Sequence, residues 1–191
     1  MAVYLNGVEV IEGNYWKVQT IGATETDTVG SGGTISAVSA IPYMILDAIT
    51  ERAYWTVFVD NDWDGVSDIV VEVLVAVGQA ETANDLMRCS LKAEYVGEHD
   101  ALAMPKTQTR SIDHDIQTYS AMGDVHKVIF VLDHDLADNI VQVGDVIGFQ
   151  FFLDDITTAP VVQVARFISA NIKYRTKQAA PIYGNPFPTE G

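Results

Sequence analysis

The segment DIVVEVLVAV, residues 68–77, carries the clearest structural signal in the sequence. Bulky apolar residues occupy every second position, and they are Ile69, Val71, Val73, Val75 and Val77. A period of two is typical of a β-strand, because successive side chains of a strand point to opposite faces of its sheet. The β-branched residues also favour strand over helix. We therefore predict a strand that turns one face into a hydrophobic core.

The same pattern extends outward from this segment in both directions. Further strands are predicted at AYWTVFV (53–59), RCSLKAEYV (88–96), HKVIFVLD (126–133), DVIGFQFFLD (145–154) and VVQVARFISANIKYR (161–175). In the last of these, the alternation places Ile168 on the same face as Ala170, Ile172 and Tyr174. Turn-forming clusters separate the strands, and no long segment has a 3.6-residue period. The pattern predicts an all-β fold, an antiparallel β-sandwich of jelly-roll type with extended terminal arms.

Two of the predicted strands are apolar on both faces. VIFVL and GFQFFL contain few polar residues that would face water. A sandwich buries only one face of each of its strands. The second face therefore needs another cover, such as an arm, a loop or a neighbouring subunit.

The two ends of the chain differ in composition from the middle. We predict an N-terminal hairpin and a Gly/Ser-rich arm over residues 1–50, a sandwich domain over 51–176, and a Pro/aromatic C-terminal arm over 177–191. Prolines hold this last segment extended. Its aromatic side chains favour a docking arm over a purely solvated tail, so the predicted partner-binding residues are Tyr183, Pro186 and Phe187.

Charge and cysteine content restrict the classes of function. The formal net charge is -15, and no basic patch is visible, so we expect no binding to nucleic acid or to an anionic membrane. The first residues, MAVYLNGVEV, lack the charged and apolar regions of an export signal, and we expect a soluble protein made in the cytoplasm. The single cysteine, Cys89, excludes an intrachain disulfide and falls on the apolar side of its strand, as a small buried hydrophobe.

The acidic stretch DNDWDGVSD, residues 60–68, has the register of a calcium loop. Asp60, Asp62, Asp64 and Asp68 match ligand positions 1, 3, 5 and 9, and the glycine expected at position 6 is present. Position 12 holds a valine instead of the expected glutamate, and the flanking segments are strands rather than helices. The alternative is an acidic turn between two strands, in which Asp and Asn cap the backbone. This alternative is favoured, so we expect no cofactor, with calcium left open.

Three of the four histidines lie between two acidic residues. These triplets are EHD at 98–100, DHD at 113–115 and DHD at 133–135. Imidazole together with carboxylate is a ligand set for zinc and similar metals, but the spacing matches no compact metal motif. Polar strand ends are the favoured interpretation. A weaker expectation is that acid-flanked histidines have raised pKa values.

Catalytic motifs are not visible in the sequence. It has no G-x-S-x-G, no phosphate-binding loop and no H-E-x-x-H, so we do not expect an enzyme. Trp63 lies in the acidic turn, where an exposed indole would offer a stacking platform for a glycan.

One set of motifs carries a resemblance to a known family. AYWTVFV is followed by the DNDWDG turn and DIVVEVLVAV, then by RCSLKAEYVGEHD, VHKVIFVLD, VGDVIGFQFFLDD and FISANIKYRT. This order, over about residues 53–176, resembles a diverse family of β-sandwich virion proteins of tailed bacteriophages. Members of that family include capsid decoration or cement proteins, head fibres and tail fibres.

The resemblance implies a structural protein of the virion. The implied protein is a bacteriophage capsid decoration or cement protein that forms a homotrimer, binds the phage major capsid protein and lies on the capsid surface. Two alternatives stay open, a head- or tail-fibre module that binds a host glycan and a single jelly-roll capsid protein. The family supplies no catalytic residues.

Overall fold

The computed structural model describes residues 3–5, 8–10, 16–25, 33–102, 105–136, 140–156 and 160–176. The residues of the predicted C-terminal arm, 177–191, lie outside this part of the chain, and so do residues 26–32 of the Gly/Ser-rich stretch. A short antiparallel hairpin, β1 (Val3–Leu5) with β2 (Val8–Val10), matches the hairpin predicted at the N-terminus. No helix in the described part of the chain is long and apolar enough to cross a membrane.

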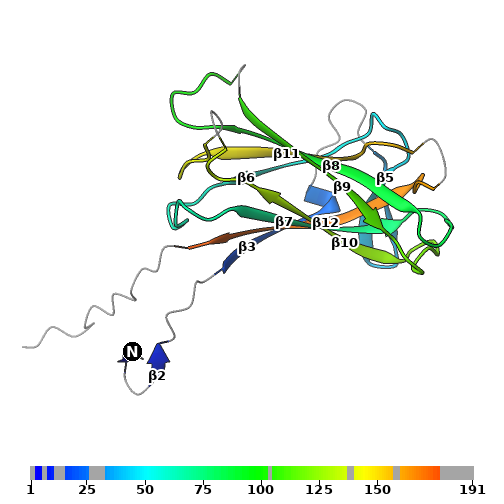
Figure 1. Cartoon of the computed structure of the whole chain (residues 1–191), viewed down its shortest axis with the longest axis horizontal. Helices are drawn as coiled ribbons and strands as arrows, with labels where there is room; N and C mark the ends of the chain where they lie inside the picture. The colour runs from blue at the N-terminus through cyan, green and yellow to red at the C-terminus, as the bar shows by residue number, and fades with distance from the viewer. Residues whose placement is uncertain are drawn as a thin grey trace, which may run out of the picture.

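Two antiparallel sheets stack face to face, as Figure 1 shows. The six-stranded sheet has the order β10-β7-β12-β5-β4, and β3 pairs with β12 beside β5. Its strands are β3 (Trp16–Gly22), β4 (Ile35–Val38), β5 (Ile41–Leu46), β7 (Ile69–Val77), β10 (Val125–Leu132) and β12 (Ala165–Arg175). The four-stranded sheet has the order β6-β11-β8-β9, and its strands are β6 (Ala53–Phe58), β8 (Leu86–Val96), β9 (Lys106–Asp115) and β11 (Val146–Leu153).

The strand order is that of a jelly roll. From β5 onward the chain crosses between the sheets at every connection except the β8–β9 hairpin. The result interleaves β10-β7-β12-β5 in one layer with β6-β11-β8-β9 in the other, which is the eight-stranded double Greek key. The fold class predicted from the sequence is therefore confirmed.

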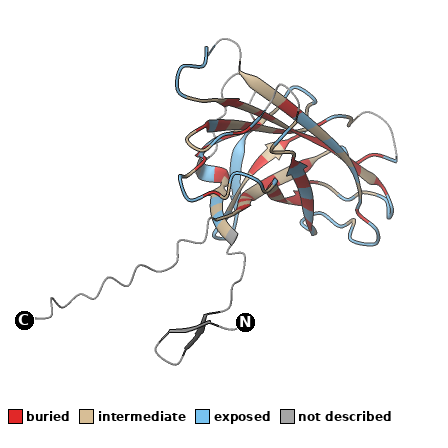
Figure 2. Cartoon of the chain, turned by 60° about the vertical axis from the view of Figure 1, so that its left-hand side comes forward, coloured by how far each residue is buried: buried red, intermediate tan, exposed pale blue. Residues whose placement is uncertain are grey.

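The core fills the space between the two layers. Buried segments alternate with more exposed ones along the strands, as the colours of Figure 2 show. The alternation is most regular in β10, where every second residue is buried. Trp55 stacks between Phe149, with ring centroids 5.3 Å apart, and Phe167, at 5.5 Å. Phe151 continues this aromatic layer toward Phe130. Cys89 is fully buried in the same core, as predicted, and burial raises the pKa of its thiol to about 12.

The sandwich begins earlier in the chain than the predicted boundary at residue 51. Strands β3, β4 and β5 all lie within residues 1–50, and β3 and β5 pair with β12. The prediction of an arm over this whole region is wrong for these strands, because long-range pairing with β12 outweighs their weak local apolar pattern. Along this edge of β12, β5 pairs with residues 165–167 and β3 pairs with residues 169–175.

The face assignment of Ile168 also needs correction. The register between β12 and β7 shifts between Phe167 and Ser169, which marks a β-bulge at Ile168. A bulge inserts one residue, so the alternation changes phase. Phe167 and Ala170 therefore both face the core, whereas Ile168 lies on the outer side and lines a surface hollow there.

Candidate interaction surface

The acidic turn DNDWDGVSD connects β6 to β7, and its first carboxylate is hydrogen-bonded to side chains of β3 and β12 in the six-stranded sheet. Asp60 accepts hydrogen bonds from the ammonium of Lys17, from the Tyr174 hydroxyl at 2.8 Å and from the Gln19 amide at 3.4 Å. The bonds from Lys17 and Tyr174 hold the pKa of Asp60 below its usual value. Asp62 lies beside the same ammonium, with an N–O distance of 3.3 Å.

The later carboxylates of the turn point elsewhere. Asp64 Oδ1 accepts the backbone N–H groups of Val66 and Ser67 at 3.0 and 2.9 Å, together with the Ser67 hydroxyl at 2.8 Å. This is the capping arrangement of an aspartate turn, and Gly65 beside it has φ +75°. Asp68 instead accepts a hydrogen bond from the ring of His134 at 2.9 Å. The structure therefore does not bring Asp60, Asp62, Asp64 and Asp68 together around one position, and the stretch folds as an acidic turn.

Trp63 does not offer a platform for a glycan. Only 1% of its surface is exposed, and it is among the largest fully buried side chains. Its indole Nε1 donates to the carbonyl oxygen and the hydroxyl of Ser67, both at 3.2 Å. The expectation of an exposed indole is wrong, because the turn folds back onto the end of β12, where Trp63 forms an isolated bridge with Thr176.

The three acid-flanked histidines lie in three different environments. His99 is exposed next to Glu98. His114 contacts His126 through ring nitrogens 3.2 Å apart, and burial, followed by the neighbouring imidazole, lowers its pKa. His134 behaves as the sequence suggests, because the hydrogen bond to Asp68 raises its pKa. The expected rise in pKa is therefore confirmed for His134 and wrong for His114. The predicted arm anchors Tyr183, Pro186 and Phe187 lie outside the described residues.

The outer face of the six-stranded sheet is the most conspicuous exposed feature of the described chain. The residues of this face lie in rows across the strands, and one row joins Val18, Lys173, Val70 and Val131. The apolar side chains with about half of their surface exposed are Val18, Val38, Ile41, Val125, Ile129 and Val131. Half-buried apolar residues between them are Tyr43, Ile45, Val70, Leu74 and Ile168.

The charges on this face are few and mostly paired. Glu72 lies between Lys173 at 2.7 Å and Lys127 at 3.7 Å, and the bond from Lys173 lowers its pKa. The guanidinium of Arg166 lies 4.8 Å from the centre of the Tyr43 ring. The cations Lys127, Lys173 and Arg166 outnumber the one carboxylate among them, Glu72, in a protein whose formal net charge is -15. Association through this face therefore avoids the repulsion that the rest of the surface would produce.

A shallow hollow of about 260 Å³ lies at one end of the face. Its lining is mainly apolar and combines the β4–β5 corner with the loop before β10, through Val38, Ile41, Tyr43, Met122, Val125, Arg166 and Ile168. Sequence reasoning predicted the uncovered apolar face of β10 but not this hollow, because the bulge at Ile168 and the position of β4 depend on tertiary pairing.

Comparisons with known proteins give structural likeness only. No protein-family model and no curated protein matches the chain. Among solved structures, dimeric latent PorU from Porphyromonas gingivalis is 3% identical with a TM-score of 0.42, over 85% of this chain and 13% of that one. The xylan-binding module CBM15 is 12% identical with a TM-score of 0.44, over 85% of this chain and 97% of the module. Infectious bursal disease virus VP2 is 10% identical with a TM-score of 0.36, over 92% of this chain and 37% of VP2. The chain thus spans a small part of PorU and VP2, and these low scores assign no function.

Proposed function

We propose that the chain is a structural virion protein, a capsid decoration or cement protein of a tailed phage, which acts as a homotrimer on the major capsid protein. The observation that supports this proposal is the uncovered outer face of the six-stranded sheet. The assignment to a phage capsid rests on the sequence motifs that resemble phage virion proteins. The mechanism is burial of surface rather than chemistry.

The size of the apolar surface sets the energy that assembly gains. A monomer rarely exposes a contiguous apolar patch larger than a few hundred Å². Burial of ~400 Å² of apolar surface contributes about 10 kcal/mol at ~25 cal/mol per Å², before the costs of ordering and association. Repeated over many copies on a capsid, such contacts would resist outward pressure on the shell.

Substitution on the face tests the assembly step. Val131→Lys places a charge on the edge strand of the exposed apolar surface, in the row that joins Val131 to Val70, and Val131 is 46% exposed. Val146→Lys is the matched control, because Val146 is a strand valine, 37% exposed, on the other sheet. Light scattering of the unchanged chain and of the control should give three times the chain mass of 20.9 kDa, whereas Val131→Lys should give monomer. A monomeric unchanged chain would overturn the trimer, and particles of megadalton mass would favour a capsid protein that assembles alone.

Removal of the C-terminal arm tests attachment separately. The truncation ends after Thr176, which lies just beyond β12 and leaves both sheets complete. We expect the truncated chain to keep its trimer but to co-sediment less with empty phage heads, because Tyr183 and Phe187 are the proposed anchors. Unchanged occupancy on heads would refute the role of the arm, and binding to a glycan array by the full chain would favour a fibre module.

A further inference from the structure

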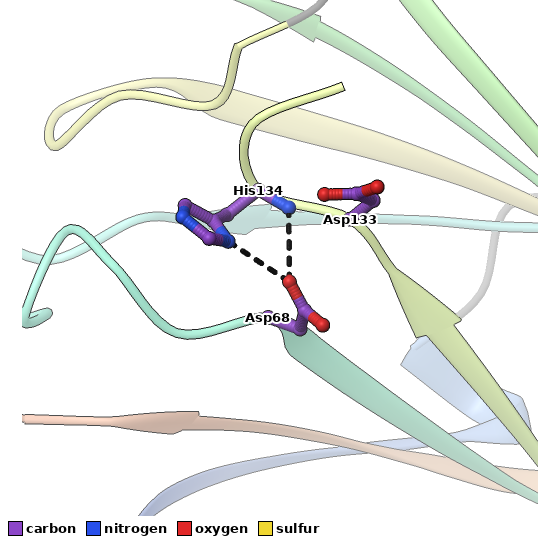
Figure 3. A group of neighbouring side chains, drawn as sticks. All are labelled: Asp68, Asp133 and His134. Atoms are coloured by element: carbon purple, nitrogen blue, oxygen red, sulfur yellow. Dashed lines mark hydrogen bonds and ion pairs between the residues drawn. The ribbon is translucent and has the colours of Figure 1, made fainter.

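A mixed set of carboxylate and imidazole groups meets at the end of the β7–β10 ladder. Asp68, Asp133 and His134 each offer one ligand atom, and these atoms all lie within 4.8 Å of one another (Figure 3). It is the one such group of three or more metal-ligating side chains that the described ranges contain.

The strand register explains why these residues meet. Ile69 is the first residue of β7, and it pairs with Leu132, the last residue of β10. Asp68 directly precedes Ile69, and Asp133 directly follows Leu132. Antiparallel pairing therefore brings the two carboxylates to the same end of the ladder. Like charges at opposed positions of a sheet are destabilising unless a cation lies between them. A positive charge at this position would therefore be stabilising.

His134 supplies part of that charge. Its ring Nδ1 lies 2.9 Å from Asp68 Oδ1, and its backbone N–H donates to the same oxygen at 3.2 Å. The ring packs edge-on against buried Trp63, with centroids 6.4 Å apart, which restricts its orientation. A third carboxylate, Asp135, is hydrogen-bonded to Asp133, and this contact raises the pKa of Asp135. The cluster thus holds three acids around one imidazole.

We propose that Asp68, Asp133 and His134 form a binding site for a first-row transition-metal dication, with Zn²⁺ as its representative. An imidazole nitrogen with carboxylate oxygens suits zinc and its neighbours, whereas calcium takes oxygen ligands only. Ligand atoms of a tetrahedral zinc are separated by about 3.4 Å, and the three ligand atoms here lie within 4.8 Å, so the widest pair needs to close by about 1.4 Å at most. This proposal is independent of the proposed function.

The surroundings leave room for a further ligand. A hollow of about 370 Å³ adjoins the site, and its lining includes Asp68 and His134 together with Val66, Val131 and Arg175. Three protein ligands leave one position of a tetrahedral metal open, and water occupies it from this hollow. Binding replaces the His134–Asp68 hydrogen bond, because Nδ1 releases its proton to coordinate the ion. Two cations oppose binding at longer range, Arg175 in the hollow and Arg110 near Asp133.

Calorimetric titration tests the site on the full chain, freed of any affinity tag and of metal. With ZnCl₂ at pH 7.5 we expect one equivalent per chain, and with CaCl₂ a much weaker response. His134→Gln and Asp133→Asn should each raise the Kd for Zn²⁺ at least tenfold, since each removes one of three ligands. Asp133→Asn keeps the His134–Asp68 bond and retains an oxygen for the backbone N–H of Asp135, so it tests the ligand without disturbing the turn.

A matched control uses another acid-flanked histidine. His99→Gln removes an exposed imidazole beside Glu98 and should leave the Kd for Zn²⁺ unchanged. The Kd should rise on acidification from pH 8 to pH 6, because a proton competes for His134. The proposal is overturned if both ligand variants bind Zn²⁺ as tightly as the unchanged chain, if His99→Gln weakens binding as much as they do, or if Ca²⁺ binds as tightly as Zn²⁺.

Discussion

Replacement of Trp63 by alanine should be among the most destabilising single changes in the chain. Trp63 is 1% exposed, and its indole N–H donates to both oxygens of Ser67. Removal of a buried Trp or Phe side chain costs about 3–5 kcal/mol of unfolding free energy. Trp63→Phe keeps most of the apolar burial but removes the indole N–H that donates to the Ser67 oxygens, which costs about 1–2 kcal/mol. The two variants therefore separate the packing of the ring from its hydrogen bonds.

Urea unfolding followed by far-UV circular dichroism measures these costs, at one protein concentration because assembly contributes to stability. Tyr119→Ala is the control, since Tyr119 is an aromatic residue that is 62% exposed, and a change within about 0.5 kcal/mol is expected there. If Trp63→Ala lowers the unfolding free energy by less than about 1 kcal/mol, the indole is not a core residue. The acidic turn would then be open for ligand binding, contrary to the structure.

Three further predictions follow from the titrating groups. Cys89, whose thiol pKa is raised to about 12 by burial, should not react with Ellman's reagent until urea unfolds the chain, so fast native labelling would contradict its place in the core. The hydrogen bond from Lys17 lowers the pKa of Asp60 in the folded protein. The ionised carboxylate therefore stabilises the fold above its unfolded pKa near 4, and this stabilisation is lost as the pH falls through the folded pKa. Asp60→Asn should therefore flatten the loss of urea stability in acid, and an unchanged slope would argue against this hydrogen bond. His114 and His134 should affect stability in opposite directions. Burial lowers the pKa of His114, so its contribution makes the protein less stable on acidification below pH ~6.5. The hydrogen bond to Asp68 raises the pKa of His134, so its contribution to stability is lost as the pH rises through the folded pKa. Melting temperatures between pH 5 and 8 for His114→Gln and His134→Gln check both signs, and parallel curves would refute them.

Local pattern was sufficient to predict the strands of the fold but not all of its pairing. The alternation in 69–77 and the turn clusters between strands predict a sandwich, and the structure confirms it. The bulge at Ile168 could not be predicted, because the sequence ARFIS continues an unbroken strand pattern and the phase change arises from pairing with β7. The contribution of β3 was missed for a similar reason, since its partner β12 is about 150 residues away.

The candidate sites show the same dependence on long-range register. Asp68 and His134 each stood out in the sequence, but in two separate motifs, and their contact depends on the pairing of Ile69 with Leu132. Trp63 was misplaced because its neighbours Asp62 and Asp64 are polar, and a local pattern places such a residue at an exposed turn. The indole is nevertheless buried, since the turn packs against the end of β12.

The difference between the two outer faces supports the proposed association through the six-stranded sheet. The outer face of the four-stranded sheet carries polar contacts, which include Lys92 with Glu94 and Arg88 with Asp113, and its exposed apolar pair, Phe58 with Val146, lies at one end. Its apolar Phe152 lies under the guanidinium of Arg52, 3.8 Å from the ring centre, so the second apolar face predicted for GFQFFL is satisfied within the chain. The second face of VIFVL has no such cover in the described structure, because the outward residues of β10 stay about half exposed. A chain with one mostly polar outer face and one apolar outer face is suited to association through the apolar side, and this is why Val131→Lys and Val146→Lys should differ.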